Sequence, residues 1–146
     1  MGAGSRPSHP LARREYEGHG LPFHDFAHSV ESLAEACTVI RRLWTEPRPF
    51  DFDGTYVQVK GAYGNPKPVQ SPHPPIVIGG RSSATLRVAA EHADVWNIPG
   101  GDLDDLVNRS ALLDRYCAEI GRAPPRSPAR SSCPSRTTNQ PSLEKR

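Results

Sequence analysis

The sequence predicts an α/β fold in which short strands alternate with helices, with one β-hairpin inserted. Residues 76–78 form an apolar β-branched run typical of a buried parallel strand, and residues 95–98 form a second strand-like segment. A helical pattern follows each of them, which favours βα units and a parallel sheet. Because two parallel strands cannot complete a sheet, we expect this chain to be part of a larger α/β domain.

A helical turn is expected at 13–16, and the first clear helix extends from about Phe26 to Trp44. Apolar residues recur along this helix at intervals of four and three, which is the spacing of one buried face. They are Phe26, Val30, Leu33, Cys37, Ile40 and Trp44. Most charged residues are predicted to face away from this stripe, namely Glu31, Glu35, Arg41 and Arg42. Pro47 ends the helix, and Cys37, which lies on the stripe, is predicted to be a buried thiol.

The next segments are a hairpin and a strand. Asp53-Gly54 is typical of a two-residue hairpin turn, and alternating residues lie on both sides of it. A proline-rich extended run, 65–75, then leads to Ile76-Val77-Ile78, which we expect to be buried on both faces. That strand ends at Gly79-Gly80.

Two further helices surround the second strand. Ser82 or Ser83 can cap a helix that continues to about Ala93. Asp102 is a good N-cap for the last helix, and Gly121 is placed to end it. The apolar face of this last helix comprises Leu103, Leu106, Ser110, Leu113, Cys117 and Ile120.

Composition and charge exclude several classes of protein. The net charge of +2, from 18 basic and 16 acidic residues, provides no field for nucleic acid or an anionic membrane. No apolar run approaches the ~18 residues of a membrane span, and the first ten residues lack the apolar core of a signal peptide. Three scattered cysteines predict neither a disulfide scaffold nor a zinc site, so we expect a cytoplasmic protein.

The strongest local motif is the segment IVIGGRSSATLRVAAEHAD, in which a buried strand ends in two glycines before a helix begins. Glycines allow backbone N–H groups to approach a ligand closely, and a helix N-terminus favours an anion. Arg81 and the hydroxyl of Ser82 add donors. The pattern suits a phosphate, although it is neither a Walker A motif nor a G-x-G-x-x-G fingerprint. A plain strand-to-helix turn with a capping serine is the alternative reading.

The remaining candidate groups point to no chemistry. The histidines show no metal-ligand spacing, and the sequence contains no G-x-S-x-G elbow or catalytic cysteine signature. His73, among prolines, is predicted to be a packing residue, and His92 lies near a helix end, where a cation suits the helix dipole. Trp44 and Trp96 are predicted to be core residues. We therefore expect no metal and name no catalytic acid or base.

Several motifs together resemble the luciferase-like monooxygenase family of flavin- or deazaflavin-dependent oxidoreductases. They are the initial GAG, the EY…GLPF stretch, the helix ending in IRRLWTE, the FDG hairpin, PKPVQSPHPPIVIGG and HADVWNIPGG. The resemblance covers most of residues 2–121. It implies a (β/α)8 TIM barrel, of which this chain would be a fragment with an inserted hairpin.

The resemblance also implies a cofactor site and a reaction. Gly79, Gly80, Arg81 and Ser82 would cradle the cofactor phosphate, and Gly4 and Ser5 would lie near its ring system. Many relatives have an aromatic residue where this chain has Ser5. Coenzyme F-420 is the favoured cofactor and FMN the alternative, with hydride transfer or monooxygenation of a small organic substrate as the reaction. The full-length parent is expected to form a homo-oligomer.

The C-terminal segment has a different composition. Residues 122–146 are rich in Arg, Pro and Ser, and Leu143 is the only large aliphatic residue among them, so we expect disorder after a domain at 1–121. With permitted synonymous codons, a one-base slip after about Arg122 converts this segment into a strand-like sequence, which suggests a frameshifted tail. The alternatives to an enzyme are a non-catalytic phosphate- or nucleotide-binding α/β module and a non-functional truncated product.

Overall fold

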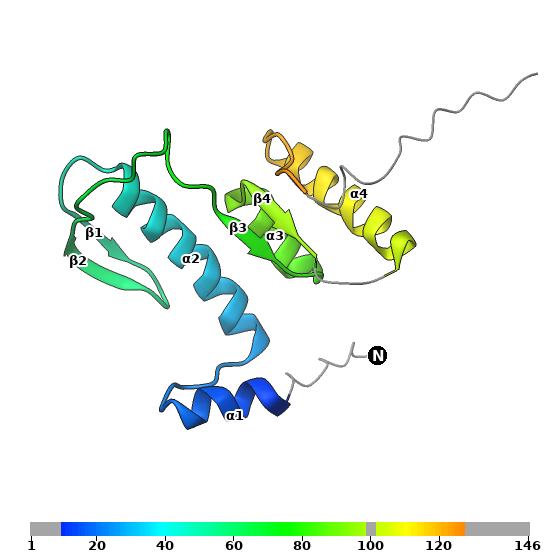
Figure 1. Ribbon diagram of the computed structural model, residues 1–146, viewed down its shortest axis with the longest axis horizontal. Helices are drawn as coiled ribbons and strands as arrows, with labels where there is room; N and C mark the ends of the chain where they lie inside the picture. The colour runs from blue at the N-terminus through cyan, green and yellow to red at the C-terminus, as the bar shows by residue number, and fades with distance from the viewer. Residues whose placement is uncertain (1–9, 99–101, 128–146) are drawn as a thin grey trace, which may run out of the picture.

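A computed structural model describes residues 10–98 and 102–127, with side chains from residue 13 onward (Figure 1). The order of elements is α1 (Pro10–Gly18), α2 (Phe26–Thr45), β1 (Phe50–Asp53), β2 (Gln58–Ala62), β3 (Val77–Gly79), α3 (Ser83–His92), β4 (Val95–Asn97) and α4 (Leu103–Glu119). The fold is mixed α/β, as predicted. Over the described residues it contains an antiparallel pair, β1–β2, and a parallel pair, β3–β4, and no closed barrel.

Helix α2 has the predicted position, and its buried face differs from the predicted stripe at two residues. Phe26 and Ile40 are 55% and 39% exposed, whereas Val39 is buried. Helix α2 packs against α3, which is half as long, and Figure 1 shows the N-terminal end of α2 extending beyond α3. Cys37 is buried as predicted, and this burial raises the pKa of its thiol, an effect that the charge of nearby Arg41 partly offsets.

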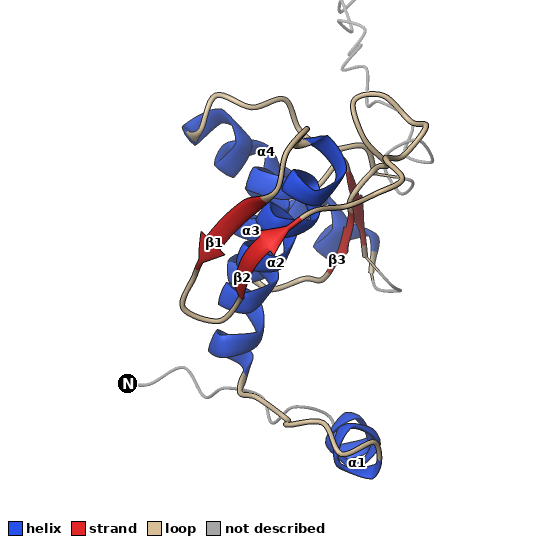
Figure 2. Ribbon diagram, turned by 90° about the vertical axis from the view of Figure 1, so that its left-hand side faces the viewer, coloured by secondary structure: helices blue, strands red, loops and turns tan. Residues whose placement is uncertain are grey.

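The hairpin packs on the charged face of α2 rather than leaving that face to solvent (Figure 2). The guanidinium of Arg42 lies 4.0 Å from the ring centroid of Phe50 and donates to the Asp51 carbonyl at 3.1 Å. The Tyr56 hydroxyl hydrogen-bonds the Glu31 carboxylate. Charged residues that the helical pattern assigned to the outside thus bind the next element of the chain.

The turn of the hairpin differs from the prediction. Asp53 pairs with Gln58, so residues 54–57 make the connection, and the expected two-residue Asp53-Gly54 turn is wrong. The Glu35 carboxylate accepts hydrogen bonds from the backbone N–H groups of this longer loop, at 2.8 Å from Thr55, 2.8 Å from Tyr56 and 2.7 Å from Val57. A side chain distant in sequence therefore sets the turn geometry.

The parallel pair β3–β4 is the centre of the core. Ile78 lies opposite Trp96 in the register, and both are buried, at 3% and 0% exposure. Figure 1 shows α3 against this sheet, with α2 and α4 on either side of α3. Val77, whose side chain points to the other face, is 59% exposed. The expectation of burial on both faces is therefore wrong for this strand, because the described residues cover only the helix side of the sheet.

Helices α3 and α4 begin where the sequence predicts. The side chain of Ser82 caps α3 and that of Asp102 caps α4, while Gly121 follows α4 with φ +68°. In the predicted α4 stripe Leu113 and Cys117 are buried and Leu106 and Ser110 are half-buried, whereas Leu103 and Ile120 at its ends are 58% and 49% exposed. The largest fully buried side chains are Trp96, Leu86, Leu113 and Cys117. No described helix combines the length and apolar character needed to cross a membrane.

The segment after α4 is ordered further than predicted. Arg126 forms a parallel bridge with Val95, accepting from the Trp96 N–H at 2.8 Å and donating to the Asp94 carbonyl at 2.9 Å. Arg122 donates to the Ala90 carbonyl at 2.7 Å. Disorder from residue 122 onward is thus wrong for 122–127, since this stretch is held by backbone pairing to the edge of β4, which needs no apolar side chains. Residues 128–146 lie outside the described part of the chain.

Candidate functional site

The candidate phosphate site lies where β3 ends and α3 begins. Gly80 has φ +145°, a conformation that L side chains rarely adopt. A Cβ at this position would lie 2.6 Å from the Cγ2 of Thr85, inside contact distance. At Gly79 a Cβ would lie 3.6 Å from the Asn97 carbonyl oxygen, an ordinary contact. Position 80 thus requires glycine. At position 79 a side chain would fit, and glycine there leaves the backbone uncovered.

The neighbouring strand holds the Gly80 peptide groups. The Gly80 N–H donates to the Asn97 carbonyl at 3.2 Å, and the Gly80 carbonyl accepts from the indole N–H of Trp96 at 3.0 Å. Trp96 is buried in the core, as predicted, whereas Trp44 is only half-buried. The turn is therefore fixed from β4 and is not a free loop.

Ser82 uses its side chain to begin α3. Its Oγ accepts the Thr85 N–H at 3.0 Å and lies 2.8 Å from the Thr85 hydroxyl, and its carbonyl accepts from Leu86. The first N–H groups of a helix have no partner within the helix. The cap satisfies the Thr85 N–H, which leaves those of Ser83 and Ala84 to water or an anion. A phosphate fits this combination of bare backbone and helix N-terminus.

Arg81 does not project freely at the turn. Its guanidinium contacts the Asp105 carboxylate at 2.5 Å, and Arg109 donates to the other oxygen of that carboxylate at 3.2 Å. The hydrogen bond from Arg81 is the main cause of the lowered pKa of Asp105, although partial desolvation opposes it and Arg109 contributes. The sequence predicted Arg81 as a donor to a ligand, and in the structure an acidic partner from α4 occupies it.

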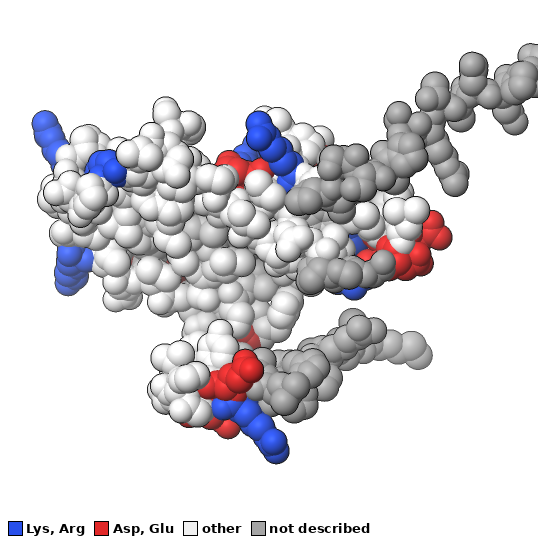
Figure 3. All heavy atoms as spheres, in the orientation of Figure 1, with Lys and Arg blue, Asp and Glu red and all other residues white. Residues whose placement is uncertain are grey.

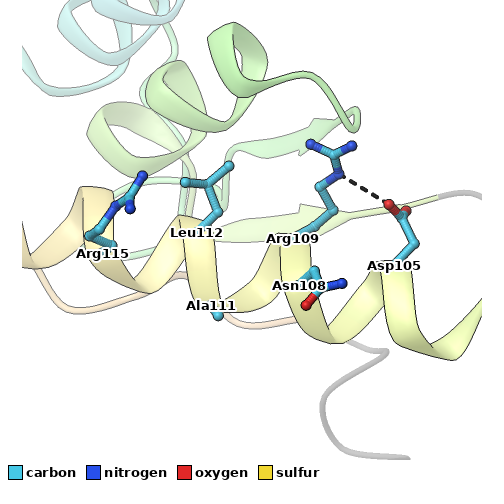
Figure 4. A pocket seen from close by; sticks show the side chains of 6 residues that line it. All are labelled: Asp105, Asn108, Arg109, Ala111, Leu112 and Arg115. Carbon is cyan, nitrogen blue, oxygen red and sulfur yellow. Dashed lines mark hydrogen bonds and ion pairs between the residues drawn. The ribbon is translucent and has the colours of Figure 1, made fainter.

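A cavity of about 520 Å³ lies along α4 and is lined by Asp105, Asn108, Arg109, Ala111, Leu112 and Arg115. Figure 4 shows Arg109, Leu112 and Arg115 on one side of the helix, with Arg109 turned toward Asp105. Of the predicted site residues that the structure describes, none lines this cavity. Asp105 connects the two features, because it lines the cavity and also binds Arg81.

Charge around the turn is mixed. Asp102, Asp104 and Asp105 lie at the start of α4, and Asp105 contacts both Arg81 and Arg109. Figure 3 shows acidic side chains gathered at that end of α4 on the face drawn. An anion at the turn would therefore depend on directed N–H groups more than on a broad positive field.

The histidines provide no metal site, since no group of three or more potential ligands occurs among the described residues. His24 and His28 stack with ring centroids 3.7 Å apart, and His73 packs against Trp44 as predicted. Burial lowers the pKa of His92, and nearby Arg41 and Arg122 reinforce this against the opposing effect of Glu91. Burial therefore disfavours the cation that would suit the dipole at this helix end.

Gly4 and Ser5 lie outside the described residues, so the structure places Gly79, Gly80, Arg81 and Ser82 of the predicted set. Sequence reasoning missed Trp96 and Asp105 as partners of the turn. The parallel pairing of 77–79 with 95–97 could have indicated Trp96, because it aligns the ends of the two strands. Nothing in the local pattern pairs Arg81 with Asp105, which is 24 residues away.

The luciferase-like monooxygenase family matches residues 7–141 of this chain. An uncharacterized protein of Mycobacterium bovis is 34% identical over 111 residues, a match that covers 76% of this chain and 36% of that protein. The chain thus spans about a third of that relative's length. The family match continues past Arg122, and the suggested frameshift there stays a prediction.

Solved structures share the fold over most of this chain, among them two enzymes. A coenzyme F-420-dependent secondary alcohol dehydrogenase, in complex with an F-420–acetone adduct, superposes with a TM-score of 0.66 at 20% identity, covering 74% of this chain and 32% of that chain. Riboflavin lyase, with modified FMN and riboflavin, superposes with a TM-score of 0.63 at 17% identity, covering 74% of this chain and 28% of that chain.

Proposed function

We propose that this chain, which belongs to the luciferase-like monooxygenase family, is part of an oxidoreductase that uses a reduced flavin or deazaflavin on a small organic substrate. The observation that carries the proposal is the turn from β3 to α3, where Gly79 and Gly80 leave bare backbone beside a helix N-terminus. Coenzyme F-420 is our first choice of cofactor and FMN the second. Solved structures of similar fold are described with each of them.

In this proposal the cofactor phosphate lies at the turn. The N–H groups of Ser83 and Ala84 bind the phosphate, and the Ser82 hydroxyl turns its proton outward while Thr85 donates to it. Arg81 contributes only after it leaves Asp105. Gly4 and Ser5 remain our candidates for the neighbourhood of the ring. When bound, the reduced cofactor supplies a hydride, and with FMN also the oxygen chemistry.

The same proposal places β3 and β4 in a (β/α)8 barrel. Their C-terminal ends carry Gly79 and Asn97 to one edge of the sheet, which is where barrel enzymes bind ligands. The exposed Val77 then faces the barrel interior, where further strands would cover it. A cytoplasmic location and a homo-oligomeric full-length enzyme belong to the same proposal.

Titration of the chain with FMN and with coenzyme F-420, followed by cofactor fluorescence, tests the function. We expect saturable binding of at least one cofactor that Gly80→Ala weakens strongly. Gly61→Ala is the matched control, because Gly61 also has a positive φ, +58°, but lies in β2 with no atom near its Cβ position. Binding of neither cofactor, or equal binding by the two variants, would contradict the proposed site.

A further inference from the structure

The buried indole of Trp96 makes a contact that core packing does not require. Its side chain is fully buried, and a phenylalanine ring would fill most of that space without a polar atom. Buried N–H groups need an acceptor. The acceptor here is the carbonyl of Gly80, at 3.0 Å, in the turn between β3 and α3.

This hydrogen bond determines the direction of the peptide group that follows. The Gly80–Arg81 peptide is trans and planar, so its carbonyl and its N–H point in opposite directions. With the carbonyl directed at the buried Trp96, the Arg81 N–H is directed away from the core. Rotation of this peptide would instead present a carbonyl oxygen to an approaching phosphate and repel it.

Glycine makes such a rotation easy unless something prevents it. The N–H of Gly80 donates to the Asn97 carbonyl at 3.2 Å, and the carbonyl of Gly80 accepts from the Trp96 indole. Both anchors come from β4, and Trp96 is fully buried with Leu86 and Leu113 in the core. The turn is thus connected to the fully buried core of the described structure.

We propose that Trp96 is a positioning residue for the phosphate site: its indole N–H holds the Gly80–Arg81 peptide with the Arg81 N–H facing the ligand. The predicted effect of Trp96 on cofactor binding rests on the proposed function. The orientation of the peptide, however, is a property of the chain without any ligand, so it is measurable separately.

The experiment compares two replacements that both remove the N–H, and the second of them removes little else. Trp96→Phe keeps an aromatic ring, and 3-benzothienylalanine at position 96 keeps the shape of the indole if Trp96→Phe fails to fold. Trp44→Phe is the matched control, because Trp44 lies near the C-terminal end of α2, where its ring stacks on that of His73. In the ligand-free chain, we expect altered amide NMR shifts confined to residues 80–83 and about tenfold faster hydrogen exchange of the Gly80 N–H, from the loss of one buried hydrogen bond.

Cofactor titration gives the second measurement. We expect the Trp96 variants to bind FMN or coenzyme F-420 about tenfold more weakly, with the Trp44→Phe affinity unchanged. Unaltered amide signals at 80–83 in both Trp96 variants would overturn the inference, as would signals that change equally in Trp44→Phe. If the unsubstituted chain binds neither cofactor, the proposed function fails, and the amide signals alone decide whether Trp96 orients the peptide.

Discussion

The hairpin loop at 54–57 and the turn from β3 to α3 both present backbone N–H groups to an anion, and they differ in where the anion comes from. In the hairpin loop the chain supplies it, since the Glu35 carboxylate accepts from three consecutive N–H groups. At the β3–α3 turn the Ser82 side chain accepts only one N–H, that of Thr85. The first site is therefore complete by itself, whereas the second retains donors for a ligand.

The arginines at the two sites show the same contrast. Arg42 lies over Phe50 and bonds a backbone carbonyl of the hairpin, so it is part of the packing. Arg81 is 44% exposed and shares the Asp105 carboxylate with Arg109, a contact that a stronger anion could replace. Hydrogen-bond donors that the protein itself occupies thus indicate a packing contact between elements. Hydrogen-bond donors that are free or exchangeable indicate a binding site.

The largest effect is expected from Gly80→Val. The substitution forces a side chain into a positive-φ position and against Thr85, so we expect about 2–4 kcal/mol of lost stability and no measurable cofactor binding. Thermal denaturation followed by circular dichroism measures the first and fluorescence titration the second. Gly61 has a φ of +58° and no atom near its Cβ position, so Gly61→Val should lose only the stability that the unfavourable backbone conformation costs. Equal losses in both variants would show that the turn is not specially constrained.

Glu35→Ala should release the hairpin without disturbing the parallel sheet. Three N–H groups lose their acceptor, so we expect faster hydrogen exchange at residues 55–57 and unchanged exchange at residues 77–79. Glu17→Ala, which removes only an exposed ion pair with Arg13 on α1, is the control. Unchanged exchange at 55–57 would mean that the β1–β2 pairing alone holds the loop.

Acid should also release the hairpin loop, because protonation of the Glu35 carboxylate weakens its hydrogen bonds with the loop N–H groups. Desolvation raises the pKa of Glu35, but the bonds from Tyr56, Val57 and Thr55 outweigh it, so the pKa lies below its ordinary value of 4.5. A carboxyl with a lowered pKa stabilises the folded state above its ordinary pKa, and this contribution is lost as the pH falls through the lowered value. Amide shifts of residues 55–57 should therefore titrate with a midpoint below pH 4.5. A transition centred above that pH would contradict the assignment.

Local patterns predicted most of the elements, because each depends on residues near one another. The apolar spacing placed α2 and α4, and Ser82 and Asp102 marked two helix starts. The failures depend on distant residues. The Glu35 carboxylate changes the hairpin turn from 20 residues away, and Asp105 binds Arg81 from 24 residues away. Residues 122–127 were misjudged because backbone pairing with β4 replaces the apolar side chains that the prediction required.

The smallest effect is expected at Asp105, and it tests whether Arg81 is exchangeable. Asp105→Asn removes the charge that holds Arg81 at 2.5 Å and Arg109 at 3.2 Å, so both guanidiniums become available to a phosphate. We expect cofactor binding to tighten by about two- to fivefold, a modest gain because exposed ion pairs are weak. Asp104→Asn, in the same first turn of α4, changes the net charge equally without touching Arg81 and should give a smaller gain. Equal gains in both variants would attribute the effect to net charge alone, and weaker binding by Asp105→Asn would show that the carboxylate orients Arg81 toward the phosphate rather than competing for it.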